Sequence, residues 1–300
     1  MSDAVPRLAA TAARMDKIEH MGWVAGISFV AYGHRIGVRV NDPAILELLP
    51  EYLPYRWKPS PAQTVERLYS LFTSGRRKNP KFRQHHALFC GAECLARSLR
   101  LRDLLEALER DIRLFVAEHA RHHIFVHAAV VGWNGRAIVI PGKSMSGKTS
   151  LAAEFVRAGA AYYSDEYAVF DEEGRVHPYA KPLSIRNTDG RSQTDCPVEV
   201  FGGRAGTRPI CVGTVLATKY REGSQWRPRF VSQGMGVMSL LANAVGARNQ
   251  PEKTIEVLGK ALAQASVLKS VRGESIEVVE SVIRSQKALR DCRLNARKVS

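Results

Sequence analysis

The residues whose types and spacing most clearly indicate chemistry form the segment Gly142–Thr149, with the sequence GKSMSGKT. It matches the pattern G-x-x-x-x-G-K-[ST], in which glycines allow backbone N–H groups to surround phosphate oxygens. The lysine neutralises the β- and γ-phosphates, the hydroxyl can bind Mg²⁺, and the following helix N-terminus adds partial positive charge. We therefore predict a bound nucleoside triphosphate, with Lys148 contacting phosphate and Thr149 contacting the metal. The rest of the loop consists of Gly142, Lys143, Ser144, Met145, Ser146 and Gly147.

The segments on either side of this loop have the patterns that a phosphate loop requires. Residues 137–140 form a short apolar run typical of a buried strand, and residues 149–157 combine helix-forming residues with apolar residues at helical spacing. Upstream, residues 124–132 form another apolar strand, and Asn134-Gly135 is a strong hairpin-turn signal. An ordinary glycine-rich turn would not need this context, so we interpret the segment as a phosphate loop.

Two acidic residues follow a strand shortly after the predicted loop helix. The segment 159–163 runs into Ser164, which Asp165 and Glu166 follow. In a nucleotide site, carboxylates at a strand end can bind Mg²⁺ and accept a proton from a hydroxyl, whereas in an ordinary turn they only face solvent. Because the phosphate loop lies one helix upstream, we favour a functional role for both acids.

Further candidates for the same pocket are a histidine and two basic groups. His127 lies inside the apolar strand, where a histidine is commonly a core residue, and its spacing to the loop makes a catalytic role equally reasonable. Arg186 ends the segment 181–186, and residues 202–208 form a basic, glycine-rich loop. Both groups could contact phosphate, and an ordinary surface role is the alternative for each.

Together, His127, the hairpin, the loop at 142–149 and the pair Asp165-Glu166 resemble the catalytic core of HPr kinase/phosphorylase. That family is similar in fold to phosphoenolpyruvate carboxykinase, and the resemblance covers about residues 122–190. It implies an α/β phosphate-loop kinase core with a mixed sheet. It also implies ATP and Mg²⁺ as cofactors and transfer of the γ-phosphoryl to a hydroxyl of the serine type.

The resemblance also implies roles for single residues. Lys148 and Thr149 would bind triphosphate and metal, Asp165 would be the base for the acceptor hydroxyl, and Glu166 would be a second metal-associated acid. His127 would face phosphate or support Asp165.

The chain departs from this family at several positions. Glu166 replaces an aspartate, Met145 a glycine and Thr149 a serine, and the downstream Glu-x-Arg-Gly signature is distorted in residues 198–204. With these departures, the chain resembles one of the HPr-kinase-related proteins of bacteria, including those that accompany peptide-modification machinery. The acceptor stays open among a protein, a peptide and a small molecule.

A formal net charge of +15 bears on the choice of partner. The basic residues occur in short separate groups, such as 76–83 and 97–102, without a recognisable nucleic-acid-binding motif, so we disfavour a nucleic-acid partner. A solvated basic surface or an acidic protein or peptide partner fits better. This leaves a second function open, a nucleotide-gated module that hydrolyses or senses ATP while it holds an acidic partner. A second copy of the chain is a further candidate partner.

Composition indicates an ordinary globular protein. Its 300 residues are 45% hydrophobic and 24% charged, enough for two domains of typical size. No apolar stretch approaches the length of about 18 residues that a membrane span needs, and the first residues lack an apolar signal core, so we expect a cytoplasmic protein without membrane contact. The cysteines are odd in number and scattered, as in reduced intracellular proteins: Cys90, Cys94, Cys196, Cys211 and Cys292.

The N-terminal part of the chain predicts a separate α+β domain. Residues 23–32 and 34–40 read as a hairpin, Asp42-Pro43 signals the start of a helix over 44–49, and residues 96–119 have the apolar spacing of a long amphipathic helix. We place the domain boundary near residue 120, with an N-terminal domain at 1–120 and the nucleotide-binding domain at 121–300. The final segments 235–245, 251–268 and 276–283 are predicted helices that pack on the sheet.

A metal interpretation of His85, His86, Cys90 and Cys94 is disfavoured. It would require a helix that brings the two cysteines to one side, and no C-x-x-C pair is present.

Overall fold

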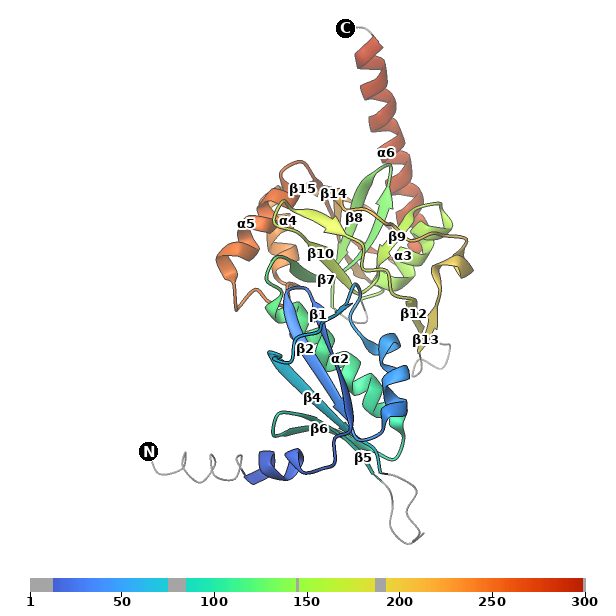
Figure 1. Ribbon diagram of the computed structural model, residues 1–300. Coiled ribbons are helices and arrows are strands. Elements are labelled where there is room, and N and C mark those ends of the chain that lie inside the picture. The colour runs from blue at the N-terminus through green and yellow to red at the C-terminus, as the bar shows by residue number, and fades with distance from the viewer. Residues whose placement is uncertain (1–12, 75–84, 144–145, 187–192, 299–300) are drawn as a thin grey trace, which may run out of the picture. The chain divides into compact units, whose positions relative to one another are not determined.

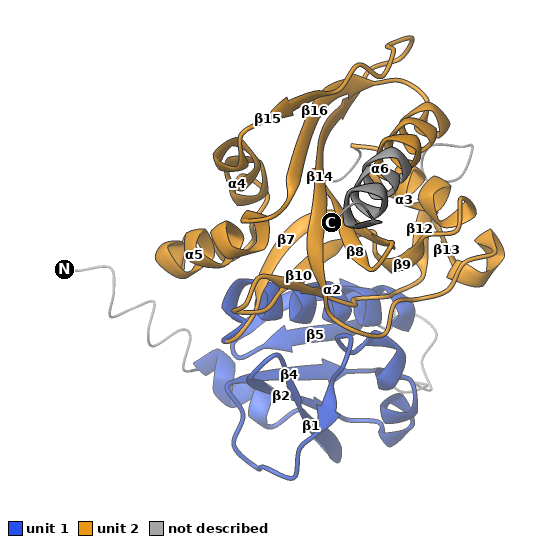
Figure 2. Ribbon diagram, turned by 90° about the horizontal axis from the view of Figure 1, so that it is seen from above, with its two compact units in different colours: residues 1–121 blue, residues 122–300 orange. Residues whose placement is uncertain are grey.

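A computed structural model describes residues 13–74, 85–143, 146–186 and 193–298 of the chain, with the side chains of 186, 193 and 287–298 left undescribed (Figure 1). The chain divides into two compact units, residues 1–121 and 122–300 (Figure 2). Each unit contains a mixed sheet with helices, so the chain has the mixed α/β class that the sequence predicts.

Unit 1 is built on a six-stranded sheet with the strand order β3-β1-β2-β4-β5-β6. Most neighbours are antiparallel, whereas β2 and β4 are parallel. The strands are β1 (Ala25–Ala31), β2 (His34–Val40), β3 (Lys58–Pro59), β4 (Arg67–Phe72), β5 (His86–Cys90) and β6 (Glu93–Ser98). The predicted hairpin of β1 and β2 is confirmed, with Ala31 paired to His34 across a tight turn.

One long helix supports this sheet. Helix α2 (Leu101–His119) packs against β5 and β6 through the apolar stripe that its sequence predicts. It starts later than the predicted residue 96, because residues up to Ser98 belong to β6. There the Ser98 hydroxyl donates to Asp103 and accepts the Arg100 N–H, which separates strand from helix.

The predicted helix at 44–49 is wrong in type. Two short 3₁₀ helices occupy this region, η1 (Pro43–Glu47) and η2 (Leu49–Tyr52). Asp42 does cap the first of them, since its carboxylate accepts the Ala44 N–H at 3.1 Å. Pro50 lacks an N–H group and cannot continue the hydrogen bonding of an α-helix.

Unit 2 is built on an eight-stranded sheet. Its main path is β11-β10-β7-β8-β14-β16-β15, and β9 pairs with β7. The strands are β7 (Ile124–Trp133), β8 (Arg136–Pro141), β9 (Ala161–Ser164), β10 (Tyr167–Phe170), β11 (Arg175–His177), β14 (Ile210–Tyr220), β15 (Arg229–Val231) and β16 (Ser266–Arg272). Strands β8, β14 and β16 run parallel to one another, and their carboxyl ends therefore meet at one edge of the sheet.

Helices cover both faces of this sheet, as Figure 2 shows. Helices α3 (Lys148–Arg157) and α6 (Ser275–Lys298) lie on one face, and α4 (Gln233–Leu241) and α5 (Pro251–Leu262) on the other. Side chains alternate between the faces along each strand, so Val215 and Val267 pack towards α4 and α5, whereas Leu216 and Leu268 pack towards α3 and α6.

The remaining elements of unit 2 are short. Strands β12 (Leu183–Arg186) and β13 (Gln193–Cys196) form a separate two-stranded sheet, followed by the 3₁₀ helix η3 (Val198–Phe201). The helix predicted over 251–268 ends at Leu262, and its last residues belong to β16. Strand β16 lies between β14 and β15, so the residues predicted as the end of a helix form an interior strand of the sheet. Within the described residues, none of the helices combines the length and apolar composition needed to cross a membrane.

Candidate functional site

The predicted phosphate loop leaves the carboxyl end of β8 and enters α3, so the strand and the helix predicted around it are confirmed. The loop begins beside β7, where the Gly142 N–H donates to the His127 carbonyl at 3.1 Å. The Ser146 N–H donates to the Lys143 carbonyl at 3.3 Å, which closes the described part of the loop. The predicted loop residues Ser144 and Met145 lie outside the described residues.

Gly147 ends the loop in a conformation that suits glycine. Its φ of 78° lies in the left-handed region, and it is the N-cap residue of α3. The helix therefore starts with its N-terminal N–H groups at the loop, where they favour an anion. The Ser146 Oγ beside it is buried and has no hydrogen-bond partner among the described residues.

Arg272, the last residue of β16, holds this loop from two strands away in the sheet. Its Nη2 donates to the Gly147 carbonyl at 2.8 Å, and its Nη1 donates to the Gly273 carbonyl at 3.0 Å. The side chain is only 2% exposed, and its Nε has no partner in the described part of the chain. Burial lowers the pKa of the guanidinium, and the charges of Tyr220 and Glu274 oppose that change. No motif in the sequence indicates this residue.

Lys148 lies in the first turn of α3 with its ammonium group buried in the loop. Its Nζ donates to the Lys143 carbonyl at 2.8 Å. Burial lowers the pKa of this ammonium, while the negative charges of Asp165 and Glu166 act in the opposite direction. The lysine and the two acids thus interact electrostatically, although the chain separates them by a helix and a strand.

Asp165 is buried at the end of β9, and both of its oxygens are engaged. The Tyr162 hydroxyl donates to Oδ1 at 2.8 Å, and the Ser184 N–H donates to Oδ2 at 3.2 Å. Burial and the Asp165 charge raise the pKa of Tyr162 above its ordinary value, so the phenol remains a donor. These two partners fix the carboxylate and leave its remaining lone pairs for other ligands.

The other acid and the histidine lie at the same edge. The Glu166 carbonyl accepts the Ala128 N–H at 3.2 Å, which joins the acid turn to β7. The His127 ring packs against the Tyr167 ring with centroids 4.9 Å apart, and the Asn243 carbonyl accepts the His127 N–H at 2.8 Å. The structure therefore brings His127, the phosphate loop and the acid pair together where β8 and β9 end, beside the interior of β7.

The remaining predicted groups are placed less fully. Arg186 is the last residue of β12, and its side chain lies outside the described part of the chain. The loop at 202–208 runs beside β9, where the Arg204 carbonyl accepts the Tyr162 N–H at 2.9 Å and the Arg208 carbonyl accepts the Tyr163 hydroxyl at 2.8 Å. The side chains of both arginines are exposed.

The oxygen atoms of Thr149, Asp165 and Glu166 are the hard donors that Mg²⁺ prefers. Within the chain segments that the structure describes, no three or more His, Cys, Asp and Glu side chains are grouped so that they could hold a metal ion. Cys90 and Cys94 lie on the adjacent strands β5 and β6, without the helix that the metal interpretation assumed.

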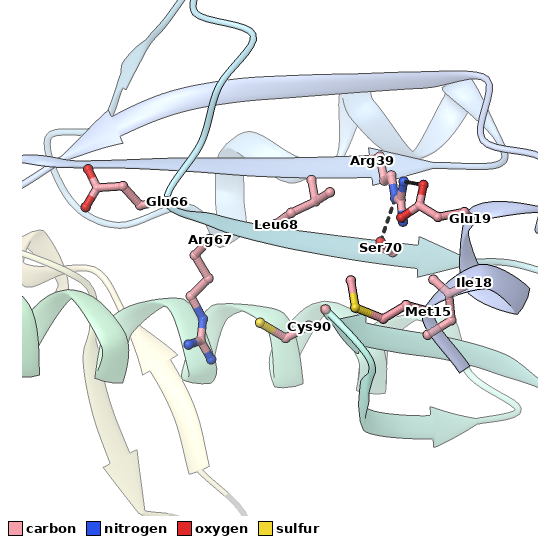
Figure 3. Close-up of a pocket in the computed structure, with 10 residues that line it drawn as sticks. Met15, Ile18, Glu19, Arg39, Glu66, Arg67, Leu68, Ser70 and Cys90 are labelled. Carbon is pink, nitrogen blue, oxygen red and sulfur yellow. Dashed lines mark hydrogen bonds and ion pairs between the residues drawn. The ribbon is translucent and has the colours of Figure 1, made fainter. Parts of the chain in front are cut away.

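A cavity of about 290 Å³ lies in unit 1 and contains none of the predicted site residues (Figure 3). Its charged side chains already have partners. Arg39 pairs with Glu19 at 2.6 Å, and Arg67 pairs with Asp111 at 2.7 Å. We therefore place the candidate site in unit 2, where the chemistry-bearing residues meet.

No protein-family model matches this chain, and no curated protein matches it. Among solved structures, the chain is similar to an Hpr(Ser) kinase/phosphatase from Coxiella burnetii, with 16% sequence identity and a TM-score of 0.34. The match covers 56% of this chain and 98% of that one.

Proposed function

We propose that the protein is an ATP-dependent kinase that transfers the γ-phosphoryl group to a hydroxyl on a protein, peptide or small molecule. The observation that carries this proposal is the meeting of the phosphate loop, His127 and the pair Asp165-Glu166 at one sheet edge. A phosphate loop alone supports nucleotide binding. A fixed carboxylate beside it adds a group that can accept the proton of an acceptor hydroxyl.

In the proposed reaction, the acceptor oxygen forms a bond to the γ-phosphorus, and the bond from that phosphorus to the β,γ-bridging oxygen breaks. ADP leaves, and the hydroxyl proton goes to Asp165. Lys148 and the N–H groups at the start of α3 stabilise the negative charge on the phosphates. Binding of the triphosphate replaces the neutral Lys143 carbonyl, the present partner of Lys148, with an anionic one.

Bound Mg²⁺ would supply positive charge that offsets the negative charge of the phosphates. Thr149, Asp165 and Glu166 would hold it, since each offers oxygen and the Asp165 carboxylate is already oriented by Tyr162 and Ser184. His127 supports this arrangement through the Gly142 N–H, which its carbonyl fixes.

Lys148→Ala tests the assignment of the loop. The variant should lose at least about a hundredfold in phosphoryl transfer from γ-labelled ATP, measured with extract of the host as the source of acceptor. Lys58→Ala removes an exposed lysine from unit 1 and should behave like the wild type. Wild-type nucleotide affinity and turnover in Lys148→Ala would show that the loop assignment is wrong.

A nucleotide-gated binding module is the second candidate. The observation that favours it is that both oxygens of Asp165 are engaged within the protein, as in a purely structural carboxylate. Asp165→Asn separates the two functions. A kinase should lose transfer and keep nucleotide binding, whereas a sensor should keep both nucleotide binding and ATP-dependent partner binding.

A further inference from the structure

We propose that the exposed end of the sheet formed by β14, β15 and β16 binds an acidic polypeptide segment of the phosphoryl acceptor. The basic sheet surface is defined here by Lys219, Arg229 and Lys269. This inference rests on the proposed kinase function, and it names the chemistry by which the acceptor is recognised.

Strand register places these cations on one face. Val215, Val267 and Val231 are neighbours in the core that faces α4 and α5. Two residues further along the strands, Ala217 pairs with Lys269, and Lys269 pairs with Arg229. Because side chains return to the same face every second residue, Lys269 and Arg229 continue the face of the valines, and Lys219 follows beside Val271.

This part of the face is open to solvent. Val267 is 2% exposed, whereas Lys219, Arg229 and Lys269 are all exposed and Val271 is 37% exposed. Figure 2 shows the ends of β15 and β16 extending beyond α4, the helix that covers the valine core. The sheet therefore presents an uncovered surface where its core ends.

The charges on this surface are unbalanced. Lys269 and Arg229 are directly opposite on adjacent antiparallel strands, an arrangement that costs stability. None of the three cations makes an ion pair with any described residue, and Glu222 is the only acid between residues 210 and 231. Carboxylates from a partner would neutralise this repulsion.

The surface fits an acidic polypeptide better than a nucleic acid. Single-stranded nucleic acids are commonly held by aromatic rings between basic residues, because bases stack on the rings. The residues between the cations are the aliphatic Ala217 and Val271. The exposed rings of Tyr220 and Phe230 project from the opposite face, since they alternate with Lys219 and Arg229.

The basic sheet surface lies at the same end of the strands as the phosphate loop, the end where β8, β14 and β16 finish. Val139 of β8 pairs with Val215 of β14, so Pro141, the last residue of β8, is level with Ala217. Lys219 thus lies beyond the end of β8, at the level where the loop begins. A segment bound there is tethered at the edge where the triphosphate binds, which raises the local concentration of the acceptor hydroxyl.

Fluorescence anisotropy with a labelled oligo-glutamate peptide tests this proposal. The variant Lys219→Gln/Arg229→Gln/Lys269→Gln should bind the peptide at least about tenfold more weakly than the wild type. The control Arg35→Gln/Lys58→Gln/Arg97→Gln removes as many exposed positive charges from unit 1 and should change affinity by less than about twofold.

Several results would overturn the proposal. Equal weakening in both variants would show a response to net charge alone. Unchanged peptide affinity with self-association of the first variant, seen by size-exclusion chromatography, would show that the cations only protect the edge strand β15 from aggregation. Binding of a labelled single-stranded DNA more tightly than the oligo-glutamate peptide, lost in the first variant, would assign the surface to nucleic acid.

Nucleotide titration in the same variants separates this inference from the proposed function. The first variant should keep wild-type nucleotide affinity, and Lys148→Ala should keep wild-type peptide affinity. If the peptide result fails while Lys148→Ala still loses nucleotide binding, the docking surface is wrong and the kinase proposal stands. If Lys148→Ala binds nucleotide normally, the kinase proposal fails whatever the peptide result.

Discussion

Unit 1 and the loop edge of unit 2 use charged side chains in opposite ways. In unit 1, the half-buried cations Arg39 and Arg67 have carboxylate partners at 2.6 and 2.7 Å. At the loop edge of unit 2, Lys148 and Arg272 donate to backbone carbonyls, and neither forms an ion pair with a described residue. Unit 1 neutralises these two half-buried cations internally, whereas this edge of unit 2 holds positive charge that a ligand can neutralise.

Arg272→Met removes positive charge from the loop edge of unit 2, and we expect it to have the largest effect. The variant removes a charged donor from the Gly147 carbonyl, so nucleotide affinity should fall by roughly 10- to 100-fold. Isothermal titration with ATP measures the loss, and Arg272→Lys should recover part of it. Arg284→Met removes an exposed guanidinium from the same unit and should have no effect. Wild-type nucleotide affinity in Arg272→Met would contradict the role of this residue.

Asp111→Asn removes a carboxylate partner from the paired charges of unit 1. Asp111 accepts from Arg67 at 2.7 Å and from the Tyr69 hydroxyl at 2.6 Å, so its loss should lower the free energy of unfolding by about 1–3 kcal/mol. Nucleotide affinity should not change. Urea denaturation measures the first effect, with the exposed Asp16→Asn as the control. Equal stability of Asp111→Asn and Asp16→Asn would mean that this network does not stabilise unit 1.

Asp171→Asn tests whether a paired charge stabilises unit 2 as well, at a position away from the site. Asp171 belongs to unit 2 but lies at the opposite end of β10 from the site. It accepts from His177 at 2.8 Å and from the Arg175 N–H at 2.8 Å, and the substitution should cost about 1–2 kcal/mol. Burial acts to raise the pKa of Asp171, but hydrogen bonds from His177 and Arg175 outweigh it and lower the pKa below 3.8.

A carboxyl group whose pKa is lower in the folded protein than in the unfolded chain stabilises the fold at pH values above its unfolded-state pKa. This stabilisation is lost as the pH falls through the folded-state pKa. The stability difference between wild type and Asp171→Asn should therefore be full above about pH 5 and shrink below the ordinary pKa of 3.8. Thermal unfolding across this range measures it. A difference that stays constant down to pH 2 would show that the Asp171 charge does not stabilise the fold.

Lys269→Glu should have the smallest effect on stability. The direction in which it changes the free energy of unfolding is the informative result. The substitution places a carboxylate opposite Arg229, so the free energy of unfolding should rise by about 0.2–1 kcal/mol while oligo-glutamate binding weakens. Lys58→Glu makes the same charge change in unit 1 and should leave peptide binding unaltered. A destabilised Lys269→Glu protein would show that the cationic pair is not a cost to the fold.

The loop region was predictable because its signals are local. The strand, the loop residues around Gly142 and the start of α3 are consecutive in the chain, and each residue type has a direct physical requirement there. The turn at Asn134 and Gly135 is equally local, since positive φ angles of 51° and 75° suit that pair. That Asp165 lies near the loop followed from the order of elements. Its predicted role as a base stays a prediction.

The errors come from interactions between distant segments. Strand β16 exists because β14 and β15 pair with it on both sides, and apolar spacing within 251–268 carries no signal of that pairing. Arg272 reaches Gly147 across 125 positions of sequence, so no motif spacing could have identified it. Similarly, the contact of the Ser184 N–H with Asp165 depends on the path of a later strand.

The Arg272 guanidinium also contacts the start of α6, where its Nη1 lies 3.4 Å from the Ser275 hydroxyl. One side chain thus joins the phosphate loop to the first turn of the C-terminal helix. If the proposed nucleotide binds at this loop and Arg272 contributes to its affinity, nucleotide and α6 are thermodynamically linked, and the linkage is reciprocal. A partner that rotates or captures α6 would change nucleotide affinity by the same factor by which nucleotide changes the affinity for that partner.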